Sequence, residues 1–210
     1  RQHPMSQQFV FTGFGGPENQ KFIEVDVPQP GPGELAVEVR AAGVNPIDWK
    51  TREGYVGTDR VLPFPMGKEV SGVVIAVGEG VEGFAVGDHV LGPVARGFGG
   101  FAEHTILNAA AAVPKPEDVS FADAATLPIA GTTAYDATHQ VELEEGQTLL
   151  ILGAGGGVGL MAAQIGRVHK FRVIGIASAS KREVVENTGA TFVESGDGAA
   201  ERVREIAPEG

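Results

Sequence analysis

The stretch Leu149-Leu150-Ile151-Leu152, followed by Gly153-Ala154-Gly155-Gly156-Gly157-Val158-Gly159, decides the fold of the second half of this chain. A short apolar strand leads there into a turn that has almost no side chains, and a segment with helical spacing follows. Bare peptide N–H groups at such a turn, together with the positive end of a helix dipole, favour the negative charge of a diphosphate. Because a Cβ would hold phosphate oxygens away, this chemistry requires glycine. The stretch therefore predicts a dinucleotide-binding turn.

The glycine spacing fits the dinucleotide pattern Gly-x-Gly-x-x-Gly when the frame is chosen with care. A frame that starts at Gly153 fails, because it ends on Val158. A frame that starts at Ala154 continues through Gly156 and Gly159, with alanine in the first position. The apolar residues that recur at helical spacing after the turn, and that predict a packed helix face, are Val158, Met161, Ala162, Ile165 and Val168. The alternative is a flexible glycine loop between packed elements.

The end of the next strand decides which nicotinamide cofactor we expect. Phe171–Ile176 reads as a second buried strand, and an NAD-selective site places a carboxylate about 20 residues beyond the first glycine. Here no carboxylate follows this strand before Glu183. Small and basic side chains instead leave room for a 2′-phosphate and can donate to it: Ser178, Ser180, Lys181 and Arg182. We therefore expect NADPH rather than NADH, with Lys181 or Arg182 as the discriminating charge, unless both cations only decorate a solvated helix.

Composition excludes several classes of function. The chain has 210 residues, a formal net charge of -11 and 42% hydrophobic residues, which suffice for one large domain or two small ones. The acidic balance argues against binding to nucleic acid or to an anionic membrane surface. The absence of cysteine excludes disulfides, thiolate zinc ligands and a cysteine nucleophile. Because no apolar run reaches about 18 residues, we expect no membrane span and a cytoplasmic protein.

The chain changes character around Pro114-Lys115-Pro116, and we place the domain boundary near residue 126. In the first 110 residues, short apolar runs separated by glycine and proline predict a small antiparallel barrel or sandwich. The expected strands are Phe9–Phe11, Phe22–Val27, Leu35–Val39, Val70–Val77, His89–Leu91 and Ala102–Leu107. From Phe121 to Gln140 the sequence is helix-compatible, and strands and helices then alternate. We expect a β-rich domain over residues 1–126 and an α/β domain over residues 127–210, which is incomplete at its carboxyl end because a doubly wound domain has about six strands.

Further stretches carry patterns that occur together in one family. They are Gly43–Asp48 with Arg52 and Gly54-Tyr55, then Val86–Val90, Gly99–Glu103 and Ala124–Tyr135. In this order, and with the turn from Ala154 to Gly159, they resemble the zinc-independent quinone-oxidoreductase branch of the medium-chain dehydrogenase/reductase superfamily. The resemblance implies a GroES-like β-rich barrel domain followed by a Rossmann doubly wound domain. It also implies NADPH-linked reduction of a quinone or an α,β-unsaturated carbonyl.

Zinc members of this superfamily hold the metal through thiolates and a histidine. This chain has no thiol, and Lys68 stands where those members often have histidine. The histidines that follow Met5 show no ligand-like spacing; they are His89, His104, His139 and His169. We therefore predict no metal site.

The resemblance also assigns roles to three residues of the reaction site. It implies that Asn45 lies near the nicotinamide or the substrate, that Tyr55 donates to the substrate carbonyl, and that Thr133 faces the cofactor. Donors of this kind can stabilise the oxyanion that hydride transfer generates. Read without the resemblance, Asn45 is equally a helix cap, Tyr55 a half-buried ring, and Thr133 a threonine that bonds its own backbone. The expected cofactor-binding residues are Ala154, Gly155, Gly156, Gly157, Val158, Gly159, Ser178, Ser180, Lys181 and Arg182.

Taken together, these patterns predict an NADPH:quinone reductase-like oxidoreductase whose partner is a small-molecule quinone or enone. Because the family often pairs its subunits, we expect a homodimer. Two alternatives stay open at this stage. One is a non-catalytic NADPH-binding protein with a structural or sensing role, and the other is an enoyl reductase module of a larger enzyme.

Overall fold

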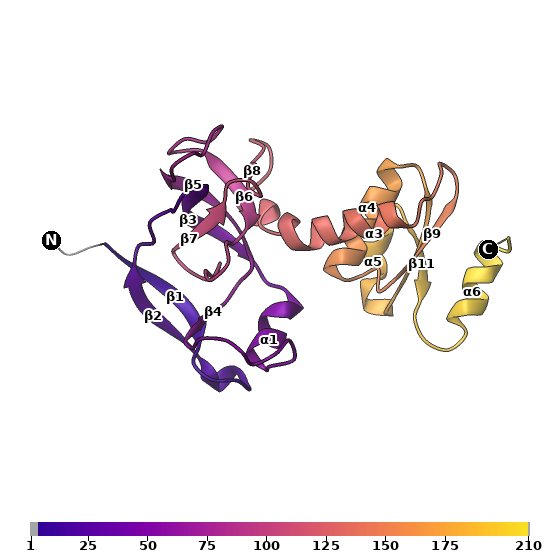
Figure 1. Ribbon diagram of the computed structural model, residues 1–210. Coiled ribbons are helices and arrows are strands. Elements are labelled where there is room, and N and C mark those ends of the chain that lie inside the picture. The colour runs from indigo at the N-terminus through magenta and orange to yellow at the C-terminus, as the bar shows by residue number, and fades with distance from the viewer. Residues whose placement is uncertain (1–3, 210) are drawn as a thin grey trace. The chain divides into compact units, whose positions relative to one another are not determined.

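The short apolar runs of the first half of the chain form two antiparallel sheets (Figure 1). The structure, a computed structural model, describes residues 4–209, and the chain divides into two units between Ile129 and Ala130. In the first unit one sheet has the strand order β2-β1-β4 and the other has the order β7-β3-β5-β6-β8. The strands are β1 (Met5–Phe11), β2 (Gln20–Asp26), β3 (Glu34–Gly43), β4 (Phe64–Pro65), β5 (Glu69–Val77), β6 (His89–Pro93), β7 (His104–Asn108) and β8 (Val113–Pro114).

One cluster of aliphatic side chains fills the inside of the larger sheet. Its strands pair antiparallel, so alternate residues of each strand point to the same side. The buried members of the cluster are Leu35, Val37, Val70, Val74, Val90 and Leu107. A bridge between Val94 and Leu107 brings the chain that follows β6 against the edge strand β7. The sheet therefore curls towards closure, as the predicted β-rich barrel requires.

The helical pieces of the first unit are short. They are a 3-10 turn (Pro17–Asn19), α1 (Pro46–Arg52) and α2 (Phe121–Ala124). The helix-compatible stretch continues after α2 as a π-helical turn, Leu127–Gly131, and then as α3, Thr132–Gln140. Pro128 has no N–H to donate, so a regular α-helical pattern of hydrogen bonds cannot run through it. The division between the units falls within this π-helical turn, whereas the sequence placed the boundary near residue 126.

The second unit is a parallel sheet with helices on both faces, which confirms the predicted α/β fold class (Figure 1). Its strand order is β11-β10-β9. Val173 and Ala177 of β10 pack with α3, α4 and α5, while Ile174 packs on the other face with Val203 and Ile206 of α6. The elements after α3 are β9 (Thr148–Leu152), α4 (Gly157–Val168), β10 (Arg172–Ala177), a 3-10 turn (Ala179–Lys181), α5 (Arg182–Glu186), β11 (Thr191–Glu194) and α6 (Ala199–Ile206).

The packed face of α4 differs from the one that the apolar spacing predicted. Val158 and Val168 were expected on that face, but both side chains are exposed. The buried residues of α4 are Gly159, Ala162, Ala163 and Gly166. A Cβ on Gly166 would lie 2.7 Å from Val173 Cγ2, so the helix approaches the sheet too closely for a large side chain at that point. Small residues therefore form the closest part of the contact, while Ala162 is buried and Met161 and Ile165 pack beside it, as the spacing predicted.

Val90→Ala should lower the free energy of unfolding by about 2 kcal/mol, because it removes two buried methyl groups and leaves a cavity. Val90 is 0% exposed in the core of the larger sheet, whereas Val86 is 66% exposed and serves as the matched control. Urea-induced unfolding measures both variants. A loss from Val86→Ala as large as that from Val90→Ala would contradict the placement of this core.

Candidate functional site

The turn after β9 is tied to the neighbouring strand by two backbone bonds. Gly153 has a φ of +78°, a left-handed conformation that glycine adopts without strain. The N–H groups of Gly153 and Ala154 both donate to Ile176 O, at 3.0 and 2.9 Å. Both donors therefore point at the end of β10, and the turn is fixed at the carboxyl edge of the parallel sheet. Ligands of open α/β sheets bind at this edge.

The first turn of α4 lies so close to the glycine turn that a side chain at position 159 would collide with the backbone. A Cβ on Gly159 would lie 2.4 Å from Gly153 O and 2.7 Å from Ala154 Cα. On the strand side, a Cβ on Gly175 would lie 2.7 Å from Ala154 Cβ. Gly159 thus does what the last glycine of the dinucleotide pattern does, which is to let helix and strand pack closely.

The first turn of α4 offers bare N–H groups. Gly156 is the N-cap residue, with an extended backbone and no side-chain cap, and the helix begins at Gly157. The first N–H groups of a helix have no partner within it, so they can bind an anion. A Cβ on Gly156 would meet only Gly153 O, at 3.5 Å, and one on Gly157 only Ala130 Cβ, at 3.7 Å. There is therefore open space beside Gly156 and Gly157. Of their neighbours in sequence, Gly155 is partly buried and Val158 is exposed.

The segment after β10 brings exposed hydroxyl groups to the same edge of the sheet. Ser178 precedes the 3-10 turn Ala179–Lys181, and its Oγ lies 3.1 Å from Ser180 Oγ. Both serines are exposed. Because β9 and β10 run parallel, this segment and the glycine turn follow the same ends of neighbouring strands.

Lys181 and Arg182 point to different neighbours, although the sequence made them equal candidates. A Cβ on Gly155 would lie 2.7 Å from Lys181 Cβ and Cγ, so the stem of Lys181 runs directly past the glycine turn. Arg182 Nη1 instead lies 3.1 Å from Glu186 Oε1. Its guanidinium carbon lies 4.4 Å from the centroid of the Phe192 ring, a cation–π distance. Lys181 is therefore the cation that lies beside the turn.

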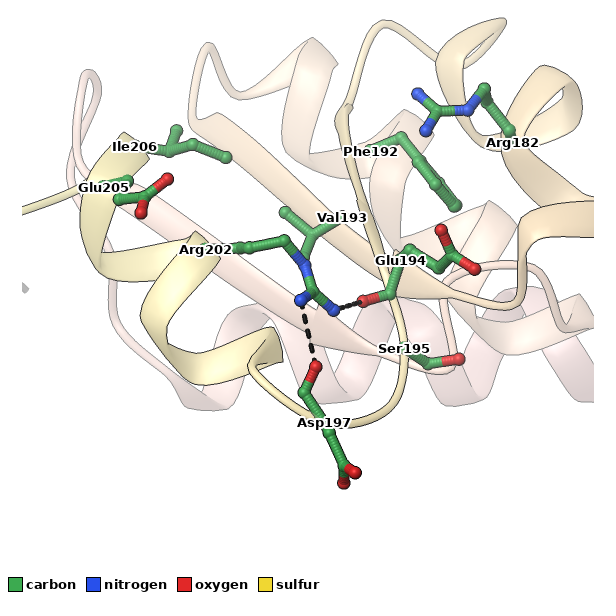
Figure 2. A pocket seen from close by; sticks show the side chains of 9 residues that line it. All are labelled: Arg182, Phe192, Val193, Glu194, Ser195, Asp197, Arg202, Glu205 and Ile206. Carbon is green, nitrogen blue, oxygen red and sulfur yellow. Dashed lines mark hydrogen bonds between the residues drawn. The ribbon is translucent and has the colours of Figure 1, made fainter.

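Arg182 lines a pocket of about 500 Å³ at the end of β11, which Figure 2 shows. Arg202 reaches into this region from α6 and donates to Glu194 O at 2.6 Å and to Asp197 O at 3.0 Å. These bonds fix the loop that follows β11. Carboxylates line the pocket as well as guanidinium groups, so its charge does not favour a phosphate. The glycine turn is the better anion site.

The three candidate catalytic residues lie on separate parts of the chain. Asn45 precedes α1 and Tyr55 follows it, so a helix of seven residues, roughly 10 Å long, separates them. The Tyr55 ring packs edge-on against Trp49, with the centroids 5.8 Å apart, and the residue is 73% exposed. The ring is thus exposed rather than half-buried. Thr133 belongs to the second unit, where it is an exposed residue in the first turn of α3.

Asn45 caps α1 and also contacts a buried carboxylate that the sequence reasoning missed. It forms a capping box with Asp48, whose Oδ2 accepts from Asn45 N at 2.8 Å. Asn45 Nδ2 lies 2.6 Å from Glu69 Oε1. Glu69 stands 24 positions further along, so local patterns could not reveal this pair. The available signal was an acidic residue at the start of an otherwise apolar strand.

Burial shifts the ionisation of three groups in this part of the first unit. It raises the pKa of the Glu69 carboxyl and that of the Asp48 carboxyl. It lowers the pKa of the Lys68 ammonium, which the nearby Asp48 carboxylate partly restores. Within residues 4–209, Asp48 Oδ1 is buried without a hydrogen-bond partner. Groups with shifted pKa values gather at functional sites, and here two of them, Asp48 and Glu69, accept hydrogen bonds from Asn45.

Comparison with known proteins identifies the family. Residues 31–117 match the alcohol dehydrogenase GroES-like domain. The chain is 34% identical to the human synaptic vesicle membrane protein VAT-1 homolog-like over 96% of its own length and 48% of that protein. It is 36% identical to the quinone oxidoreductase of Rattus norvegicus over 83% of its length and 54% of that protein. A crystal structure of an NAD-dependent alcohol dehydrogenase superposes with a TM-score of 0.91 at 31% identity, over 96% of this chain and 67% of that one.

The chain belongs to the quinone oxidoreductase-like branch of the medium-chain dehydrogenase/reductase superfamily. This family member spans about half the length of the curated relatives that it matches. Its first unit holds the GroES-like domain and its second unit the Rossmann-type sheet, as the resemblance implied.

In the described part of this quinone oxidoreductase-like chain, no three His, Asp or Glu side chains gather as metal ligands would. His139 and His169 do come together, with ring centroids 5.2 Å apart and edge to face, although their spacing gave no hint of it. Two imidazoles supply fewer ligands than the three or four of common zinc sites. Nor does any helix within residues 4–209 have the length and apolar character needed to cross a membrane.

Gly159→Ala should lower the free energy of unfolding by about 1–3 kcal/mol, because the added methyl group would overlap the backbone of the turn. Gly157→Ala is the matched control, since its Cβ has room and alanine stabilises a helix by about 0.5–1 kcal/mol relative to glycine. Urea-induced unfolding followed by circular dichroism measures both. Equal effects of the two changes would argue against the close approach of α4 to the turn.

Proposed function

We propose that the protein is a zinc-independent, NADPH-dependent oxidoreductase that transfers hydride to a quinone or an α,β-unsaturated carbonyl. The observation that carries this proposal is the bare turn after β9, where the first N–H groups of α4 adjoin open space beside Gly156 and Gly157. The relation to the rat quinone oxidoreductase supports the class of acceptor. The homodimer expected from the resemblance and the cytoplasmic location expected from the sequence belong to the same proposal.

The glycine turn fits a dinucleotide diphosphate on physical grounds. Apart from the exposed Val158, the residues from Ala154 to Gly159 carry no large side chain, and the end of the sheet holds the turn in place. In this proposal the N–H groups of Gly157 and Val158 bind phosphate oxygens, and the dipole of α4 adds to the attraction. Gly155 gives the backbone room to pass the stem of Lys181.

The 2′-phosphate is assigned to the segment after β10. Lys181 lies beside the turn, and the hydroxyl groups of Ser178 and Ser180 stand nearby on the same segment. Arg182 is less suited to this role, because Glu186 and the Phe192 ring already hold its guanidinium. We therefore narrow the discriminating charge to Lys181.

The reaction needs donors for the acceptor oxygen and a source of hydride. NADPH supplies the hydride when it is bound. Quinones and enones both take hydride at a carbon conjugated to a carbonyl, so negative charge develops on the carbonyl oxygen. In this proposal the Tyr55 hydroxyl and the second Nδ2–H of Asn45 stabilise that charge, and Thr133 helps to orient the cofactor. These donors take the place of zinc in a chain that has no cysteine and has Lys68 at the usual histidine position.

Lys181→Ala should weaken NADPH binding by about 10-fold to 100-fold, because a charge-assisted bond to the 2′-phosphate is lost. NADH binding should change by less than about 2-fold, since NADH has no such phosphate. Arg182→Ala is the control and should affect NADPH less. Titration calorimetry on the full-length protein gives all three affinities. Equal losses of NADPH and NADH in Lys181→Ala would contradict the assignment.

The full-length protein should oxidise NADPH when a quinone or an enal is supplied. The assay follows the loss of NADPH absorbance with a panel of quinones and enals. Turnover above the uncatalysed background with at least one class is the expected result. Tight binding of NADPH without hydride transfer to any member of the panel would count against the proposed function and favour a non-catalytic role.

A further inference from the structure

The Glu69 carboxylate joins two segments of the first unit that are far apart in sequence. Glu69 begins β5 and is 2% exposed. Its Oε1 accepts from Asn45 Nδ2 at 2.6 Å, and its Oε2 accepts from Ile129 N at 2.7 Å. One oxygen therefore binds the residue that caps α1, and the other binds the π-helical turn Leu127–Gly131. Both bonds are short, as expected for bonds to an ionised acceptor.

The backbone around this carboxylate is shaped to receive it. Gly43 is the register partner of Glu69 in the pairing of β3 with β5. A Cβ on Gly43 would lie 2.1 Å from Glu69 Oε1 and 2.6 Å from Ala125 O. Any residue other than glycine would expel the carboxylate from its position. The arrangement therefore depends on a glycine as well as on the two donors.

Burial and a neighbouring carboxyl both disfavour the ionised form of Glu69. Burial raises the pKa of the carboxyl, and the Asp48 carboxyl of α1 raises it further, while the bonds from Asn45 and Ile129 lower it. The nearby Lys68 ammonium lowers the pKa of the Asp48 carboxyl and so offsets part of the effect of its burial. A buried carboxylate is tolerated when hydrogen bonds satisfy it, so the two donors are required.

We propose that Glu69 is a positioning residue that fixes the orientation of the Asn45 amide for hydride transfer. A carboxylate only accepts hydrogen bonds, so the amide must turn Nδ2, and not Oδ1, towards it. A flipped amide would place its oxygen against Glu69 Oε1 and lose the bond. The second Nδ2–H and Oδ1 are thereby held in fixed directions, and the bond to Ile129 N holds the carboxylate itself. This inference rests on the function proposed above.

The test compares Glu69→Gln with Glu103→Gln in the full-length protein. Glu103 is the matched control, because its Oε2 also accepts a backbone N–H, that of Gln7 at 2.8 Å, but at an exposed site. Glutamine keeps the size of Glu69 and one acceptor, but its NH2 group must face one of the two donors. We expect kcat of Glu69→Gln to fall roughly 10-fold to 100-fold, as for a misplaced reacting group. The Kd for NADPH should change by less than about 2-fold.

The pH profile of kcat adds a readout that a merely structural role would not move. In the wild type and in Glu103→Gln, kcat should fall on the acidic side as Glu69 is protonated and gives up an acceptor. The pKa of Glu69 lies above its ordinary value, so this fall begins at milder acidity than for an exposed glutamate. Glu69→Gln should lack that acidic limb. A variant with lower thermal stability but unchanged kcat and an unchanged limb would overturn the proposal.

The side-chain amide of Asn45 gives a measurement that needs no turnover. In ¹⁵N-labelled wild-type protein its NH2 signals, assigned by their loss in Asn45→Ser, should shift with pH in step with the acidic limb. This titration decides the matter if Glu69→Gln does not fold. If no acceptor is reduced, the proposed function fails, while a titrating amide still supports the orientation by Glu69. Signals that do not respond to pH would overturn the proposal in either case.

Discussion

The second unit depends on one close approach of backbone to backbone. Gly159, in the first turn of α4, faces Gly153 O and the backbone of Ala154 at distances that exclude a side chain. The N–H of Ala154 is in turn fixed by Ile176 O at the end of β10. Because the helix is held this near to the end of β9, its first N–H groups stand at the carboxyl edge of the sheet. The candidate anion site is therefore a consequence of how helix and strand pack.

Local patterns predicted much of this fold, and contacts between distant residues did not follow from them. The glycine turn and the strands around it are encoded in adjacent residues. The face of α4 was predicted correctly for Met161, Ala162 and Ile165 and wrongly for Val158 and Val168, which are exposed. Periodicity also missed Gly159 and Gly166, which the close approach to the sheet requires. The choice between Lys181 and Arg182 depends on the direction of each side chain, which the 3-10 turn before α5 sets. The bond between Asn45 and Glu69 spans 24 positions and needed the pairing of β3 with β5.

The two units differ in the kind of charge that they place at their candidate sites. The second unit offers partial charges of the backbone, which need no desolvation of an ion before a ligand arrives. The first unit buries whole charges, Glu69 and Asp48, whose pKa values are raised by that burial. Burying a charge costs free energy of desolvation, and backbone or amide N–H groups offset that cost for both carboxylates by donating hydrogen bonds. In the proposed reaction the first arrangement binds the diphosphate, and the second orients the Asn45 amide.

A crystal structure of the full-length protein with NADPH tests the central claim most directly. The account predicts that the diphosphate lies within hydrogen-bond distance of the N–H groups of Gly157 and Val158, with the 2′-phosphate next to Lys181. A dinucleotide bound elsewhere, or a diphosphate that avoids these N–H groups, would contradict it.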